Sequence, residues 1–286
     1  MRTAATDSAK TIRAALPGGL WEEDGEPIRQ VEMRTVGGDD ELFVLDAQGQ
    51  RPAAQATALL ERCVLDPHAV IDSLTIGDRE ALLLQLRQVT LGDDLDCLLD
   101  CPSDGCGEQL ELRMSINDML LAPYDEVHQQ YSARFTVHGR EHHVEFRLPR
   151  TADLDAAAST NPEWGATALL RACVRRVTID DRAASVDDLD PLAVTRVADE
   201  MLARDPQAEI RLDARCPACG HRFDALFDTG SFLLQELQAR AQRLVADVHL
   251  LALHYHWSER DILAMSASRR DHYLDLLGAE FARRST

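Results

Sequence analysis

The hydrophobic and polar positions of residues 27–230 follow one order of elements twice: a hairpin, two helices, and two strands around a cysteine-containing turn. Short runs that alternate apolar and polar residues predict the strands. Apolar residues spaced three or four apart predict the helices. The first series is 28–46, 56–64, 77–89 and 94–114, and the second is 133–149, 166–174, 190–202 and 208–227. The pattern therefore predicts an α+β fold built from an internally duplicated unit.

The strongest local sign of duplication is a repeated helical segment. ATALLERCV at residues 56–64 and ATALLRACV at residues 166–174 agree at all but two positions. The flanking elements recur in the same order, which a chance match between two alanine- and leucine-rich helices would not require. In the first hairpin we expect the turn at Gly37-Gly38-Asp39-Asp40, with a strand on either side.

The last part of the chain has a purely helical pattern. Residues 231–256 predict a single helix with an apolar seam of 3-4 spacing, formed by Leu234, Leu237, Ala241, Leu244, Val248, Leu251 and Tyr255. The pattern predicts four parts: a flexible N-terminal arm (1–26), a first repeat (27–130), a second repeat (131–230) and a helical C-terminal docking segment (231–286). The alternative for the last part is that it packs back onto the preceding domain.

Cysteines occupy the turn between the two strands at the end of each repeat. The turns are Cys101-Pro-Ser-Asp-Gly-Cys106-Gly and Cys216-Pro-Ala-Cys219-Gly. In both, proline fixes φ after the first cysteine, and glycine permits a positive φ after the second. A structural zinc ion takes four thiolate or imidazole ligands, and each turn supplies two. We therefore expect Cys101, Cys106, Cys216 and Cys219 to share one structural zinc ion.

Two alternatives to this ligand set stay open. Cys97 or His221 could replace one of the four thiolates, or the turns could hold no metal. Cys63 and Cys173 occupy equivalent positions in apolar helices, so we expect them to be buried as small hydrophobic residues. Four thiolates would close the coordination sphere, and a closed zinc site stabilises structure without activating water.

The histidines are the other candidate metal ligands. His249, His254 and His256 flank the seam of the last long helix, and we expect them to be solvated or interfacial. His142 and His143 are neighbours in an alternating run, which places them on opposite faces of a strand. The sequence has no phosphate-binding loop, no Gly-x-Ser-x-Gly elbow and no cysteine or histidine nucleophile context. We therefore expect no enzymatic activity.

Composition narrows the class of partner. Acidic residues number 49 against 30 basic ones, for a net charge of −19. Nucleic acids and anionic membranes attract basic surfaces, so neither is expected as a partner, and nothing indicates a small-molecule ligand. The N-terminal residues lack the apolar core of a signal peptide, and no run approaches the length of about 20 apolar residues that spans a membrane. With no secretory signal, seven cysteines favour reduced thiols and metal over disulfides, and we expect a cytoplasmic protein.

A resemblance to a known family appears in the C-terminal residues. Residues 256–277, HWSERDILAMSASRRDHYLDLL, together with the paired cysteine turns, resemble the family of the T4-type phage baseplate hub assembly chaperone and contractile injection system baseplate proteins. The matching features are Trp257, Asp261-Ile262-Leu263, Arg269-Arg270 and Tyr273-Leu274. Residues 77–93 are similar as well, whereas Met265-Ser266 stands where members often have Leu-Pro.

The resemblance implies a non-enzymatic structural or assembly (chaperone) protein for the baseplate hub of a phage tail-like contractile injection system. Its partners would be other baseplate or tail hub proteins. One alternative is a zinc-ribbon nucleic-acid or transcription accessory protein, although the first cysteine turn is flanked by the acidic residues Asp100, Asp104, Glu108 and Glu111. The other is a metal hydrolase that uses the late histidines.

Overall fold

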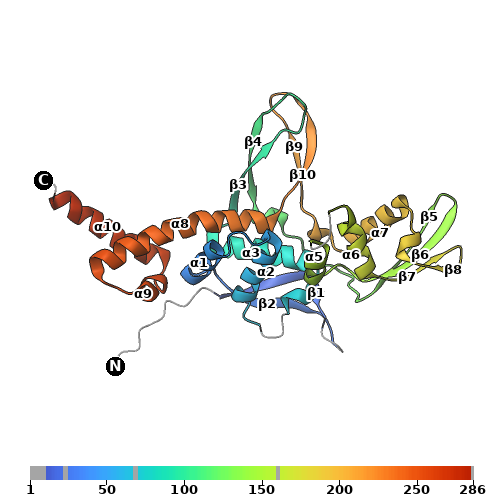
Figure 1. The fold of residues 1–286 in the computed structure, drawn as a ribbon, viewed down its shortest axis with the longest axis horizontal. Helices are drawn as coiled ribbons and strands as arrows, with labels where there is room; N and C mark the ends of the chain where they lie inside the picture. Colours follow the sequence, from blue (N-terminus) through green and yellow to red (C-terminus); the bar gives the residue numbers. More distant parts are fainter. Residues whose placement is uncertain (1–10, 22–24, 67–69, 159–161, 285–286) are drawn as a thin grey trace. The chain divides into compact units, whose positions relative to one another are not determined.

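Strands and helices follow one another along the chain, which ends in three helices (Figure 1). A computed structural model describes residues 11–21, 25–66, 70–158 and 162–284. Up to residue 146 the elements are β1 (Thr11–Leu20), β2 (Ile28–Arg34), α1 (Gly38–Asp46), α2 (Pro52–Cys63), η1 (Ile71–Ser73), α3 (Ile76–Leu91), β3 (Asp94–Asp100), β4 (Gln109–Ser115), α4 (Ile116–Met119), β5 (Tyr131–Val137) and β6 (Arg140–Phe146). From there they are α5 (Thr151–Ala158), α6 (Pro162–Cys173), β7 (Val174–Ile179), β8 (Arg182–Ala184), η2 (Val186–Asp188), α7 (Pro191–Arg204), η3 (Pro206–Ala208), β9 (Arg211–Arg215), β10 (Arg222–Leu226), α8 (Thr229–Tyr255), α9 (Glu259–Leu263) and α10 (Ala267–Arg284).

The chain divides into two compact units. The first unit takes Met1–Ile12, Met33–Leu65 and Gly230–Thr286, and the second takes Arg13–Glu32 and Asp66–Thr229. The sequence-based boundary between residues 130 and 131 falls inside the second unit. Among the described residues, no helix combines the length and the apolar character needed to cross a membrane.

The first unit contains the helical C-terminal segment, as the sequence predicts. Helix α8 buries Leu234, Leu237, Ala241, Leu244 and Leu251, which are five of the seven predicted seam positions. Near its end, α8 turns into α9 and α10 around a cluster formed by Leu251, Ile262 and Leu277. The indole ring of Trp257 stacks on Tyr255, with ring centroids 4.5 Å apart, and meets Tyr273 edge-on at 4.8 Å. The last two helices therefore pack on the end of α8.

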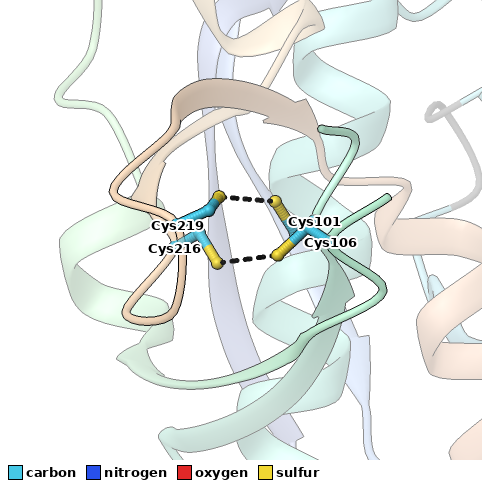
Figure 2. Close-up of side chains that lie close together, drawn as sticks. All are labelled: Cys101, Cys106, Cys216 and Cys219. Carbon is cyan, nitrogen blue, oxygen red and sulfur yellow. Dashed lines mark hydrogen bonds between the residues drawn. The ribbon is translucent and has the colours of Figure 1, made fainter. Parts of the chain in front are cut away.

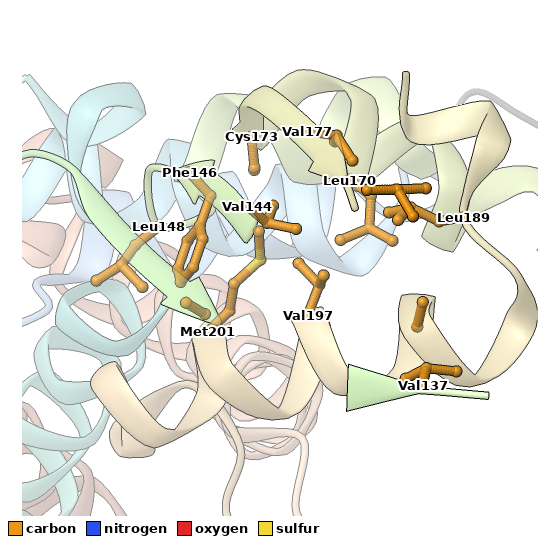
Figure 3. Packing of buried hydrophobic residues seen from close by; sticks show 13 residues of the cluster. Val137, Val144, Phe146, Leu148, Leu170, Cys173, Val177, Leu189, Val197 and Met201 are labelled. Carbon is orange, nitrogen blue, oxygen red and sulfur yellow. The ribbon is translucent and has the colours of Figure 1, made fainter. Parts of the chain in front are cut away.

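In the second unit one hydrophobic core lies between a sheet and two helices. Strands β5, β6, β7 and β8 form an antiparallel sheet in that order. Phe146 and Val144 of β6 are fully buried. They pack with residues of α6 and α7 that are shown in Figure 3, among them Cys173 and Met201. The hairpin predicted over residues 133–149 is therefore confirmed as β5 and β6, and it is extended by β7 and β8.

The first predicted hairpin is wrong in its second half. Residues Gly38–Asp46 form helix α1 and do not form a strand. The expected turn is the start of this helix: Asp40 accepts a hydrogen bond from the backbone N–H of Gly37 at 2.9 Å. The acids Asp39, Asp40 and Glu41 fill the first helical turn, where negative charge is favourable. A Gly-Gly-Asp-Asp sequence suits a helix start as well as a hairpin turn, and here the helix forms.

The N-terminal arm predicted for residues 1–26 needs a second correction. Residues Thr11–Leu20 form β1, the strand that pairs with β2. Ala14 and Leu16 on this strand are fully buried. This segment is therefore part of the folded structure. Residues 1–10 and 22–24 of the predicted arm lie outside the described residues.

One arrangement of an arginine, an aspartate and a cysteine occurs in both units. Arg34 contacts Asp40 at 2.5 Å, and Arg147 contacts Asp153 at 2.6 Å. In each case the aspartate lies in the first turn of the next helix and accepts a backbone N–H, from Gly37 or from Arg150, at 2.9 and 2.8 Å.

The helix after each ion pair ends at a fully buried cysteine. These are Cys63 at the end of α2 and Cys173 at the end of α6, and the prediction that both are buried is confirmed. The valine that follows each cysteine then pairs with a strand: Val64 with Met33, and Val174 with Phe146.

Two buried carboxyl groups connect distant segments of the second unit. Asp78 accepts the N–H of Gly18 at 2.8 Å, and Asp205 accepts the N–H of Gly77 at 2.9 Å. Asp205 also accepts the hydroxyl of Tyr124 at 3.0 Å. A Cβ atom on Gly77 would lie 1.9 Å from Asp205 Oδ1, so only glycine allows this approach. Burial raises the pKa of both carboxyl groups, that of Asp78 to about 6.

The raised pKa of Asp78 predicts a pH dependence of stability. Between the ordinary value of 3.8 and about 6 the folded chain binds the proton more tightly than the unfolded chain, so this group's contribution to stability falls as the pH rises. By neutral pH the loss is roughly 3 kcal/mol. Asp78→Asn removes the titration. Measured by urea denaturation, the free energy of unfolding of this variant relative to that of the wild type should therefore increase from about pH 4 to about pH 7. The exposed Asp125, changed to Asn, is the control; parallel pH curves for wild type and Asp78→Asn would contradict the prediction.

Candidate metal centre

Two β-hairpins of the second unit present the cysteine turns. Strands β3 and β4 form the first cysteine hairpin and strands β9 and β10 the second, both antiparallel as predicted. The hairpins come from distant parts of the sequence and lie side by side (Figure 1), packed through a small apolar cluster. This cluster includes Leu99, Leu110, Leu112, Ala214 and Phe223.

The two turns have matching backbone hydrogen bonds. The N–H of Cys101 donates to the carbonyl of Glu108 at 2.8 Å, and the N–H of Cys216 donates to that of His221 at 2.9 Å. The glycines after the second cysteines, Gly107 and Gly220, have φ values of 64° and 76°. A side chain is disfavoured in this left-handed region, which explains the Cys-Gly ending of both turns.

The four turn cysteines converge on one point. Their sulfur atoms all lie within 4.8 Å of one another. Figure 2 shows the closest contacts across the hairpins, Cys101 to Cys219 at 3.7 Å and Cys106 to Cys216 at 3.6 Å. Four sulfurs about 2.3 Å from a tetrahedral zinc ion would be about 3.8 Å apart. The spacing of this cysteine cluster therefore fits such an ion.

The protonation of the cysteine cluster shows why a cation suits it. Hydrogen bonding by the backbone of His221, with the neighbouring thiols, lowers the pKa of Cys219 to about 7. The backbone of Ser103 acts in the same direction on Cys101, but burial and the other thiols outweigh it and raise the pKa of Cys101 to about 12. The pKa of Cys106 is also raised. Thiols this close ionise together only when a positive charge compensates them.

The alternative ligands lie outside the cysteine cluster. His221 is exposed, and its ring stacks on Phe223 with ring centroids 6.1 Å apart. Cys97 is buried in β3 opposite Leu112. Over the described ranges, the four turn cysteines are the one group of histidine, cysteine, aspartate or glutamate side chains with metal-binding spacing. The exposed His249, His254 and His256 form no such group there.

The placement of Arg215 is not evident from the sequence. Arg215 pairs across the second cysteine hairpin with Arg222, and like charges opposite each other destabilise a hairpin. Its Nη2 atom lies 3.9 Å from where a Cβ atom would stand on Gly220, so the guanidinium reaches the turn that carries Cys219. The sequence shows that Arg215 directly precedes Cys216. The register of the hairpin is needed to show that it lies opposite Arg222.

The first cysteine hairpin has an acidic surface. Asp94, Asp96, Asp100, Asp104, Glu108 and Glu111 are exposed there. One basic residue, Arg113, pairs with Asp96 at 2.9 Å. This surface would repel nucleic-acid phosphates, so it gives no support to a nucleic-acid interface at the first hairpin.

Comparison with known families gives one match. A family model described as T4 bacteriophage base plate protein matches residues 26–234, which is most of the chain. The matched range contains both cysteine hairpins and residues 77–93, whereas residues 256–277, with the C-terminal resemblance, lie beyond it. No curated protein and no solved structure matches the chain.

Proposed function

Because the chain belongs to the T4 bacteriophage base plate protein family, we propose that it acts in the baseplate hub of a phage tail-like contractile injection system. Membership of the family gives it a structural role in a baseplate. The finer role proposed here is that of a non-enzymatic structural or assembly (chaperone) protein for the hub. Its partners are other baseplate or tail hub proteins, and assembly takes place in the cytoplasm. The family match over residues 26–234 is the observation that supports this proposal.

The proposal includes a structural zinc ion bound by Cys101, Cys106, Cys216 and Cys219. The sulfur spacing, the matched turns and the mutual perturbation of the thiol pKa values support it. Four thiolates around Zn²⁺ carry a net charge of about −2. This charge would be compensated in part by Arg215 and would offset the repulsion between Arg215 and Arg222. The zinc would supply cohesion between the hairpins, and a closed site of this kind leaves no position for a substrate.

We also propose that residues 27–230 arose by internal duplication. The support is the repeated arrangement of ion pair, helix and cysteine. Arg147 follows Arg34 by the same number of residues as Asp153 follows Asp40. In both copies a further helix and then a cysteine hairpin come after the buried cysteine. The second copy differs by the added strands β7 and β8.

The C-terminal helices are proposed as a docking segment. Although α9 and α10 pack on the end of α8, large apolar side chains stay exposed on α8 and α10, notably Leu253 on α8 and Leu276 and Phe281 on α10. Where such side chains form one contiguous patch, they mark a surface that binds other proteins. A protein partner from the same particle is consistent with the role proposed above.

The zinc proposal predicts one zinc ion per chain by elemental analysis of the purified protein. Cys101→Ser and Cys216→Ser should each abolish zinc binding, because each removes a ligand from the shared site. Cys97→Ser is the matched control: it lies in the same hairpin, outside the cluster, and should retain zinc. A wild-type chain without zinc, or zinc retained by either ligand variant, would contradict the shared site and leave the family role untouched.

Compensation of the thiolates by Arg215 predicts an effect of this residue on metal affinity. Arg215→Ala should weaken binding of Co²⁺, followed by its thiolate absorption, by about three- to tenfold at low salt, since exposed charges interact weakly. The difference should shrink as salt rises. Arg211→Ala, at the far end of the same strand and paired with Glu209, should bind as the wild type does. Equal affinities for all three proteins would show that Arg215 does not compensate the thiolates.

The assembly role predicts the loss of finished particles. Deleting the gene from a strain that makes the contractile particle should leave no sheathed tails in electron micrographs, because the hub would not form. Expression of the wild-type chain from a plasmid should restore them. Normal particles in the deletion strain would refute the role in assembly.

A further inference from the structure

The cysteine cluster consists of two pairs of thiols that face each other across the hairpins. Cys101 of the first hairpin lies 3.7 Å from Cys219 of the second, and Cys106 lies 3.6 Å from Cys216. Figure 2 shows the two contacts side by side. A disulfide bond is about 2.05 Å long, so each pair needs a closure of roughly 1.6 Å, shared between two turns.

The thiols differ in access. Cys219 is exposed and Cys106 is half-buried, whereas Cys101 and Cys216 are 7% and 1% exposed. Each cross-hairpin pair therefore joins one accessible thiol to one buried thiol. A small oxidant can reach the accessible member, and the buried member stands ready as the second sulfur. This pairing of an accessible and a resolving thiol is the arrangement that redox-active cysteines use.

We propose that the cysteine cluster is also an oxidisable site, at which a peroxide converts the thiols into two cross-hairpin disulfides, Cys101–Cys219 and Cys106–Cys216. The inference rests on the proposed metal site, since it concerns the same four sulfurs. The thiolate of Cys219 attacks one oxygen of H₂O₂, giving a sulfenic acid and hydroxide. The sulfur of Cys101 then gives up its proton, displaces the second hydroxide and forms the S–S bond. This proton and one from solvent convert the two hydroxides into water.

The second pair reacts in the same way through Cys106. In total, the four cysteine sulfurs lose four electrons, two molecules of H₂O₂ become four of water, and any bound Zn²⁺ leaves because its ligands are gone. The hairpins, however, stay joined. The cluster thus links them through metal under reducing conditions and through covalent bonds under oxidising conditions.

Digestion with trypsin distinguishes disulfides between the two hairpins from disulfides within each turn. Cleavage after Arg87, Arg113, Arg215 and Arg222 yields residues 88–113, with the cysteines of the first turn, and residues 216–222, with those of the second. We expect the full-length protein, treated with H₂O₂ and digested without reductant, to give these two peptides as one linked species by mass spectrometry. Disulfides within each turn would give two separate, internally oxidised peptides and would overturn the proposal, as would sulfinic or sulfonic acids.

Double variants test the pairing itself. Cys101→Ser with Cys219→Ser leaves Cys106 and Cys216, a facing pair, and should still link on oxidation. Cys101→Ser with Cys216→Ser leaves Cys106 and Cys219, and should link about tenfold more slowly because disulfide geometry is specific. Equal rates would overturn the assigned pairing.

Zinc content, measured beforehand on the same sample, keeps the two proposals apart. A zinc-free protein that still forms the linked peptide would refute the metal and retain the redox site. A zinc-loaded protein that forms only disulfides within each turn would support the metal site and refute the redox site.

Discussion

The joining of two hairpins by four sulfur atoms is the constraint on which the candidate site depends. A two-stranded hairpin is marginally stable on its own in water, and the apolar cluster between these two is small. The contacts that close it connect residues 110 and 118 positions apart. Fixing two points so far apart in the sequence removes much of the freedom of the unfolded chain. A bond at this place would therefore strengthen the association of the hairpins.

The local sequence predicts the cysteine turns well because their geometry is local. Proline after the first cysteine and glycine after the second follow directly from φ requirements, and the structure shows the positive φ values. The helices that end at Cys63 and Cys173 are equally local, since apolar spacing determines their buried face. The long α8 is predicted for the same reason.

The missed elements depend on contacts between distant residues. Strand β1, TIRAALPGGL, has proline and glycine and lacks the β-branched alternation of a typical strand; its pairing with β2 makes it a strand. Helix α1 contains the apolar run LFVL, which fits a strand equally well. Asp40, which forms ion pairs with Arg34 and Arg62, favours the helix start. The demand for glycine at residue 77 comes from Asp205, which local sequence does not reveal. The role of Arg215 needs the hairpin register.

The electrostatics of the cysteine cluster argue for a structural and against a catalytic use. A catalytic metal site keeps one position open for water or substrate, whereas here four thiols surround a single point. The acidic hairpin that carries two of them adds repulsion, so a cation at the centre would lower the energy of the fold around it. The same crowding places sulfur beside sulfur, with one member of each pair accessible to solvent. Cohesion and sensitivity to oxidants therefore have one origin, the approach of two turns that each contribute two thiols.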